Sequence, residues 1–185
     1  MPAIIDPRNN WALVEQRLAS ETDPILIRNL EVVLKHMKAE ATADFDMLMS
    51  TVGKQAKYAF FGSEDQEGFA GPKSREEVEA FYRSVMELGI HRIEHNIDRL
   101  IVDREHIVTE GEMKIAYPGQ LLKDMGHPIE YVDAYYLYHT RSAIIWIIDE
   151  DGLVSGEDSY TGQDGFAGIE NRRISLDDVI TVEGK

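Results

Sequence analysis

The chain contains no cysteine, and this absence excludes several kinds of chemistry. Disulfide bridges, thiolate nucleophiles and cysteine-ligated metals all require a residue that is not there. Basic residues are also scarce, because 19 Lys and Arg stand against 34 Asp and Glu, which gives a formal net charge of −15. A surface this acidic repels nucleic acid and anionic membranes, so we expect neither as a partner.

Long apolar runs and targeting signals are missing as well. No window approaches ~18 uninterrupted apolar residues, the length that a membrane-spanning helix needs. The first ten residues, MPAIIDPRNN, have neither the basic start nor the apolar run of a signal peptide. The sequence therefore predicts a soluble, cytoplasmic protein.

Motifs that hold metals or phosphates are absent too. The sequence has no His-x-His or HExxH pattern and no carboxylate cluster of the form of a metal site. The GFAGP stretch at 68–72 lacks the GK[ST] ending of a phosphate-binding loop. We therefore predict no metal ligands.

The first half of the chain has helical periodicity. Apolar residues at helical spacing predict helices over residues 10–19, 24–41, 44–52 and 74–89. Asp23, Asp44 and Ser74 are suited to cap the last three of these helices, and Ser74-Arg-Glu-Glu77 has the form of a capping box. A short strand is expected at 58–61. The stretch 62–72 contains three glycines and is expected to form a loop or a flap.

After Gly89 the apolar residues recur with a period of two, which predicts strands. We expect strands over 91–103, 107–117 and 131–148, and a tight reversal followed by a returning strand over 153–161. A strand as long as 131–148 twists and curls, so the helices must cover its concave face and enclose a space. The expected fold is α+β, with one curved antiparallel sheet wrapped around N-terminal helices as a cone or half-barrel. It forms a single domain, 1–185, in which segments 1–22 and 163–185 are peripheral.

Three motifs resemble the NTF2-like superfamily, in particular its SnoaL-like branch. Residues 36–44, HMKAEATAD, resemble the first long helix of the family and the turn after it. Ala80-Phe-Tyr82 resembles the helix that closes the cone, and residues 151–160 resemble the final strand. The resemblance covers about 26–162 and implies a cone with a deep apolar pocket.

The resemblance is compatible with several reactions. The superfamily includes ketosteroid isomerase, scytalone dehydratase, polyketide cyclases, a limonene epoxide hydrolase, lyases of lignin-derived aromatics and non-catalytic binding proteins. Its active members use neither a metal nor an organic cofactor, and buried acid–base groups move a proton on a hydrophobic substrate. We therefore expect no cofactor here.

Four residues are candidates for acid–base chemistry. His36 and Glu40 are four residues apart and share a helix face, where the carboxylate can orient the imidazole and raise its basicity. The alternative for this pair is an exposed position on the outer side of the helix. His95 belongs to the inward row of its strand, which suits a general base, and its position resembles that of the catalytic histidine of the dehydratase-like members. The alternative is a core histidine bonded to a backbone carbonyl. Tyr117 ends the inward row of the next strand. Its position resembles that of a second acid–base residue of the dehydratase-like members, which is a histidine there. A phenol at this position can donate a hydrogen bond to a developing oxyanion.

The long hairpin supplies the expected ligand contacts. Its aromatic residues suit a flat aromatic ligand, although each of them can instead pack under the helices or at a dimer face. Arg141 lies among apolar residues, so we expect it to be buried with an anionic partner, either Glu157 or Asp158 or a phenolate or carboxylate of the substrate. The predicted substrate-binding residues are Tyr136, Tyr138, Arg141, Trp146, Glu157 and Tyr160.

These observations favour a cofactor-independent lyase, dehydratase or isomerase that acts on a small hydrophobic molecule, with a phenolic, lignin-type aromatic as the preferred substrate. The alternative is a non-catalytic binding or scaffold protein of the same fold. An enzyme pocket would contain at least two titratable polar groups, whereas a binding cone would be lined only by apolar groups. Because both faces of the long strand are apolar, we also expect a homodimer or small oligomer through the sheet, formed by Val132, Ala134, Tyr136 and Tyr138 or their neighbours.

Overall fold

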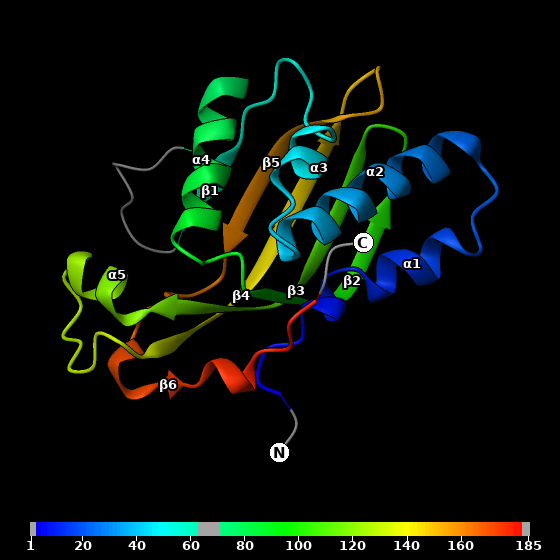
Figure 1. The fold of residues 1–185 in the computed structure, drawn as a ribbon. Helices are drawn as coiled ribbons and strands as arrows, with labels where there is room; N and C mark the ends of the chain where they lie inside the picture. The colour runs from blue at the N-terminus through cyan, green and yellow to red at the C-terminus, as the bar shows by residue number, and fades with distance from the viewer. Residues whose placement is uncertain (1–2, 63–70, 183–185) are drawn as a thin grey trace.

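The computed structural model describes residues 3–62 and 71–182, which fold into a curved sheet with helices across one face (Figure 1). The expected flap at 62–72 falls largely on residues 63–70, outside the described part of the chain. The helices are α1 (Ala12–Leu18), α2 (Pro24–Ala41), α3 (Phe45–Met49), α4 (Arg75–Glu87) and α5 (Gly119–Asp124). The strands are β1 (Ala59–Phe61), β2 (Ile93–Val102), β3 (His106–Pro118), β4 (Tyr135–Ile148), β5 (Val154–Thr161) and β6 (Arg173–Ile174).

The sheet is mixed only at one edge. Its order is β1-β5-β4-β3-β2, and β6 pairs with the first residues of β4. Strands β2 to β5 are antiparallel, whereas β1 runs parallel to β5. The long strands β3 and β4 change direction midway, and the sheet remains open (Figure 1). The predicted α+β class with a curved sheet is therefore confirmed.

Local sequence signals account for where the helices begin. The side chains of Asp23, Asp44 and Ser74 accept hydrogen bonds from the first-turn amides of α2, α3 and α4. The predicted capping box at Ser74 is incomplete, because the Glu77 carboxylate accepts from the amide of Lys73 (2.8 Å). Three predicted helix starts thus have the caps that the sequence indicated.

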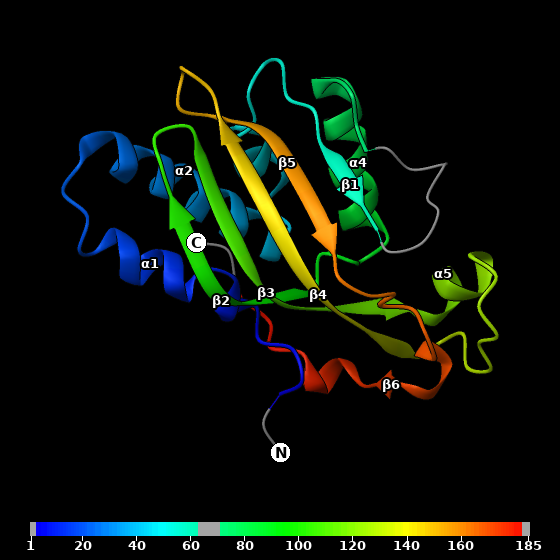
Figure 2. The same cartoon turned by 180° about the vertical axis from the view of Figure 1, so that it is seen from behind.

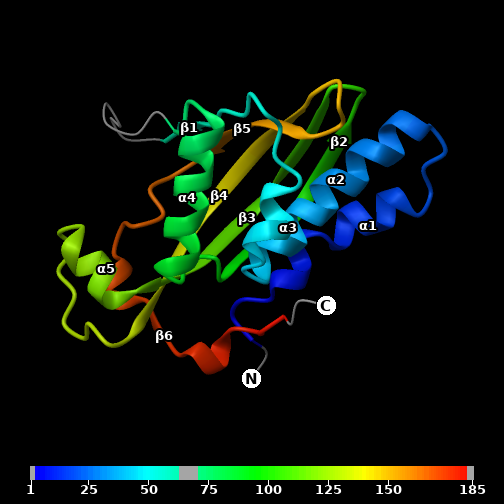
Figure 3. The ribbon, with the colours of Figure 1, turned by 45° about the horizontal axis from the view of Figure 1, so that its top comes forward.

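The main core lies between the concave face of the sheet and helices α2, α3 and α4 (Figure 3). From α2 it receives Leu30, Val33 and Met37, which recur at helical spacing. From β4 it receives Ile144 and Trp146, which alternate with more exposed residues. The periodicity of each segment therefore selects the face that it buries.

Strand β4 starts later than the sequence indicated, and its inward row is now defined. It begins at Tyr135, and residues 131–134 belong to the connection that follows α5, a helix within the expected loop 118–128. Tyr136 is buried on the inward row and Tyr138 lines the inner cavity, so neither lies on the outer face where the association prediction placed them. The odd-numbered residues of β4 form the outer row, which includes Ala143, Ile145 and Ile147 in its second half.

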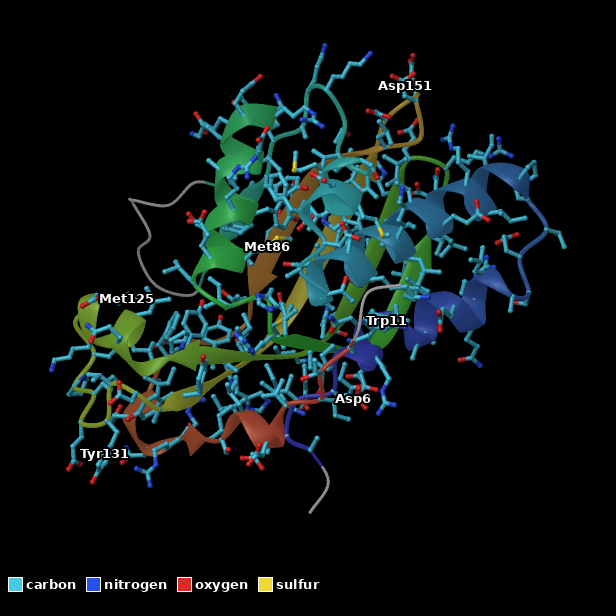
Figure 4. The ribbon with its side chains drawn as sticks, in the orientation of Figure 1. Asp6, Trp11, Met86, Met125, Tyr131 and Asp151 are labelled. Carbon is cyan, nitrogen blue, oxygen red and sulfur yellow. The ribbon has the colours of Figure 1, made fainter. Side chains whose placement is uncertain are left out.

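The two terminal segments, expected to be peripheral, both contribute buried side chains. Trp11 and Val14 of the N-terminal segment join the main core. Ile169 of the tail packs with Leu122, Ile129 and Tyr136 in a second, smaller cluster. This cluster lies at the end of the sheet marked by Met125 and Tyr131, far from the Asp151 turn (Figure 4). None of the helices within 3–62 and 71–182 is both long and apolar enough to cross a membrane.

The described helices leave the outer face of the sheet uncovered (Figure 2). Ile101, Val108 and Ile145 lie side by side in register across β2, β3 and β4, and Ile101 is 63% exposed. We predict that this row forms a self-association surface. Ile101→Glu would place a charge in it and should convert a dimer into a monomer, as measured by sedimentation velocity at micromolar concentration.

Leu88→Glu is the matched control, because Leu88 is also exposed (45%) but lies at the end of α4 and is not part of the outer row. It should leave the sedimentation coefficient unchanged. A monomeric wild-type protein, or equal association of wild type and Ile101→Glu, would contradict the prediction.

Candidate functional site

A cavity of about 330 Å³ lies between the concave face of the sheet and helices α2 and α4. Most of its lining is apolar or aromatic. Its titratable lining residues are Glu40, Tyr82, His95, Tyr117, Tyr138 and Glu157. A wider hollow of about 940 Å³ near the β4–β5 turn is lined by surface lysines and carboxylates and contains none of these groups. The inner cavity is therefore the candidate site.

His36 on α2 is the centre of a buried hydrogen-bond network behind the cavity wall. Its side chain is completely buried, with Nδ1 2.7 Å from Thr51 Oγ1 and Nε2 2.8 Å from the Tyr82 hydroxyl. Nε2 is also 3.1 Å from Glu157 Oε1, and the Tyr82 hydroxyl donates to the same oxygen (2.9 Å). The network joins α2, α4 and β5 across the core.

The hydrogen-bond directions assign a donor role to Nδ1 of His36. The Thr51 hydroxyl donates to the carbonyl of Leu48 (2.6 Å), so it accepts from Nδ1–H. The Tyr82 hydroxyl lies within reach of Nε2, of Glu157 Oε1 and of the Tyr58 hydroxyl (3.5 Å), and Nε2 lies beside both Tyr82 and Glu157. The imidazole therefore bridges Thr51 on one side and the Tyr82–Glu157 pair on the other.

Glu40 lies one helical turn after His36, and its carboxyl group lines the cavity. It accepts no hydrogen bond from any residue in the described part of the chain. The pKa of Glu40 is raised from 4.5 to about 7, mainly by burial and also by the negative charge of Glu157, while His36 acts in the opposite direction. The predicted sharing of a face by His36 and Glu40 is confirmed, although the two groups do not hydrogen-bond to each other.

His95 lies on β2 and lines the cavity, as its inward row predicted. The side chain is 3% exposed, and neither ring nitrogen has a hydrogen-bond partner among the described residues. Burial lowers the pKa of His95 to about 4, and the nearby Ser142 backbone offsets only part of this effect. The ring is therefore neutral at neutral pH. The alternative of a core histidine bonded to a backbone carbonyl holds in part, because the Ser142 backbone interacts with the ring although no hydrogen bond of full geometry forms.

Tyr117 and Tyr138 form an aromatic wall with Phe166 from the C-terminal tail. The Tyr138 ring centroid is 5.7 Å from that of Tyr117 and 4.7 Å from that of Phe166. Burial raises the pKa of both phenols, so they stay protonated and can act only as neutral donors or acceptors. All three side chains line the cavity.

The remaining candidates fall in two groups. Trp146 and Glu157 line the cavity, as expected for ligand contacts, whereas Tyr136 is buried in the smaller cluster and Tyr160 stacks on the exposed ring of Phe61. The expectation of a buried Arg141 is wrong. Both rows of β4 are apolar enough to be buried, and the odd-numbered row faces outward.

Arg141 is exposed on the outer face, where it pairs with Asp98 (2.6 Å) and Glu110. The expected partners Glu157 and Asp158 do not contact it.

Several site residues lacked a recognisable signal in the sequence. Tyr82 was noted only as part of the cone-closing helix, and its hydroxyl reaches Glu157, 75 residues away along the chain. Thr51 lies at the end of a short helix, and Asn10 and Phe166 lie outside the region of the resemblance. Such long-range contacts depend on the packing of the elements, which periodicity does not encode.

Comparison with known proteins supports the fold through structure alone. No family model and no curated protein matches the chain. A Jannaschia sp. CCS1 structure assigned to the SnoaL-like polyketide cyclases is 18% identical with a TM-score of 0.56, covering 77% of this chain and 91% of its own. An NTF2-like protein from Anabaena variabilis is 16% identical with a TM-score of 0.54 (78% and 96% covered). An LEH-like epoxide hydrolase from M. tuberculosis is 14% identical with a TM-score of 0.56 (80% and 94% covered).

These similarities identify the class of structure. The chain has the NTF2-like fold, and the resemblance to the SnoaL-like branch is confirmed at the level of the fold. Identities below one fifth do not transfer a reaction, so the chemistry has to be argued from the groups in the cavity.

The network around His36 makes a prediction about stability. Tyr82→Phe removes the hydroxyl that contacts both His36 and Glu157 and leaves each of these buried side chains with one partner fewer. We expect the free energy of unfolding to fall by about 1–3 kcal/mol, measured by urea denaturation.

Tyr58→Phe is the matched control, because the Tyr58 hydroxyl is 3.5 Å from that of Tyr82 and is equally buried. Its loss should cost less. Equal or larger destabilisation by Tyr58→Phe would show that the His36 network is not held by Tyr82.

Proposed function

We propose that this protein is a cofactor-independent enzyme that transfers a proton on a small, neutral, hydrophobic molecule held in the inner cavity. The observation that carries the proposal is the Glu40 carboxyl group, which faces an apolar cavity without a hydrogen-bond partner from the described residues and has a pKa of about 7. A group with such a pKa is divided between its acid and base forms at neutral pH. The reaction would be a lyase, dehydratase or isomerase step that begins with proton abstraction.

Glu40 and Glu157 have separate roles in this proposal. Glu157 is held in position by its contacts with His36 and Tyr82. Its charge helps to hold a proton on Glu40. Pairs of carboxyl groups with different surroundings are typical of enzymes that use one of them for proton transfer. Glu40 is therefore our proposed base, with His36 and Glu157 as positioning residues.

His95 and Tyr117 act in this proposal as hydrogen-bond donors to the substrate. With a pKa of about 4, His95 is a weak base, so the abstraction first considered for it is better assigned to Glu40. A neutral imidazole and a protonated phenol both donate hydrogen bonds. Such donors stabilise an oxygen that gains negative charge when a proton leaves the neighbouring carbon.

The lining of the cavity also suggests the class of substrate. Aromatic side chains of Phe81, Trp146 and the wall formed by Tyr117, Tyr138 and Phe166 suit an aromatic or polycyclic body. The described lining contains two carboxyl groups and no Lys or Arg, which disfavours an anionic substrate. Arg141, which the sequence suggested as the partner of a substrate phenolate, lies outside the cavity. The phenolate of a lignin-type substrate would therefore have no cationic partner in the described lining. A neutral aromatic ketone or alcohol fits better.

The alternative is a non-catalytic binding or scaffold protein with the same cavity. The titratable groups Glu40, His95 and Glu157 favour an enzyme, since an apolar cone would suffice for binding. Among proteins of similar fold, one is described as an epoxide hydrolase and one is assigned as a polyketide cyclase, which is compatible with catalysis in this fold.

Deuterium exchange at the α-carbon of 2-tetralone tests the proposal without knowledge of the natural substrate. In D₂O the wild-type protein should accelerate exchange over buffer, and the rate should rise as the pH passes about 7, because the base form of Glu40 accumulates above its pKa. Glu40→Gln should lower the rate by about 10²–10⁴-fold, the usual contribution of a general base.

Glu31→Gln is the matched control, because Glu31 is an exposed carboxylate on the same helix. It should exchange deuterium at the wild-type rate. No acceleration by the wild-type protein, or full exchange by Glu40→Gln, would contradict the proposal and favour the binding protein.

A further inference from the structure

We infer that His95 forms a polar subsite that recognises a neutral hydroxyl or carbonyl oxygen of the ligand, on the β2 side of the cavity. The inference depends on the proposed function only in taking the cavity as the ligand site, and it holds for an enzyme or a binding protein. The evidence is the contrast between His95 and the other buried polar side chains around it.

Both ring nitrogens of His95 are buried, and neither makes a hydrogen bond of ordinary geometry within the described part of the chain. The Ser142 backbone acts on the ring and raises its pKa, but burial outweighs this effect. The buried polar groups nearby are paired, since Thr140 donates to the carbonyl of Gln163 (2.7 Å) and Thr109 accepts from the Trp146 indole (3.1 Å). Buried polar groups without partners are costly, so two on one ring indicate a partner that enters through the cavity.

The surroundings of His95 hold the ring in place without using its nitrogens. Asn10 accepts a hydrogen bond from the His95 amide and donates to the carbonyl of Ile93 (3.3 Å), which fixes the strand at this point. Asn10 itself is 5% exposed and lines the same cavity. The backbone around His95 is thus anchored, while its ring nitrogens make no hydrogen bond of ordinary geometry with the described residues.

The backbones of β2 and β3 approach each other closely near the ring. Gly111 lies on the inward row of β3, in register with Ile97 on one side and Ser142 on the other. A Cβ atom at Gly111 would lie 2.0 Å from the carbonyl oxygen of Asn96, so no larger residue fits there without a shift. Ser142 lines the cavity on the next strand, and its hydroxyl donates to the carbonyl of Tyr160 (3.2 Å). The polar group of the subsite is therefore the imidazole of His95.

The chemistry of the subsite selects its ligand group. A neutral imidazole offers one donor and one acceptor, which a ligand hydroxyl can satisfy together and a carbonyl can satisfy in part. A carboxylate would meet Glu40 and Glu157 in a cavity whose described lining has no Lys or Arg. An apolar molecule with one neutral oxygen function therefore fits both the wall and the subsite.

Binding of 2-naphthol and 2-methylnaphthalene tests the inference, because the two probes share a shape and differ in the hydroxyl group. Their dissociation constants are measured by equilibrium dialysis at pH 7 for wild type, His95→Leu and His95→Gln. The preference for naphthol is the ratio of the two dissociation constants. It should fall by about 10-fold in His95→Leu, because losing one hydrogen bond of about 1.4 kcal/mol changes a dissociation constant by that factor. His95→Gln retains a donor and an acceptor and should keep part of the preference.

Thr140→Val is the matched control, since Thr140 lies in the same rung of the sheet as His95 and has a protein partner. It should lower the melting temperature and leave the preference unchanged. His95→Leu should have an unchanged or higher melting temperature, because it removes buried nitrogens that no described residue satisfies.

The inference is overturned if the ratio of the two dissociation constants is the same in wild type and in His95→Leu, or if it favours naphthol less in wild type than in His95→Leu. If His95→Leu does not fold, the imidazole ¹⁵N shifts of the wild-type protein decide. They should move with 2-naphthol and not with 2-methylnaphthalene, and equal shifts would overturn the inference. Dialysis involves no turnover, so failure of deuterium exchange would leave this result unaffected.

Discussion

The structure depends on one buried interaction, the contact of the His36 imidazole with the Glu157 carboxylate and the Tyr82 hydroxyl. These three residues come from α2, β5 and α4, so the interaction fixes both helices against the sheet. Breaking a buried pair on one side is costly, because the remaining charge loses its partner. The same contact places Glu40 one turn further along α2, at the wall of the cavity. The position of the candidate base thus follows from the network behind it.

The electrostatic asymmetry of the cavity has the same origin. Glu157 is held by contacts within the network, whereas Glu40 is surrounded mainly by apolar side chains and feels the charge of Glu157. On the opposite side, His95 is neutral and the phenols remain protonated. One side of the cavity can accept a proton and the other can donate hydrogen bonds. This division, more than the fold, distinguishes the site from an apolar binding cone.

Much of this arrangement could be predicted from periodicity. The helical spacing of α2 placed His36 and Glu40 on one face, and the alternation in β2 and β3 placed His95 and Tyr117 inward. Arg141 was misplaced because both rows of β4 are apolar, so parity alone could not select the buried one. The contacts of Tyr82 and Thr51 with His36 could not be predicted, because they join residues 46 and 15 positions apart through tertiary packing.

The central claim is that Glu40 holds its proton up to neutral pH because of burial and the charge of Glu157. The most direct test is an NMR titration of the Glu40 side-chain carboxyl carbon in the unliganded protein. The account predicts a midpoint near pH 7, falling towards the ordinary value of 4.5 when Glu157→Gln removes the second charge and opens the network. A midpoint near 4.5 in the wild-type protein would contradict it.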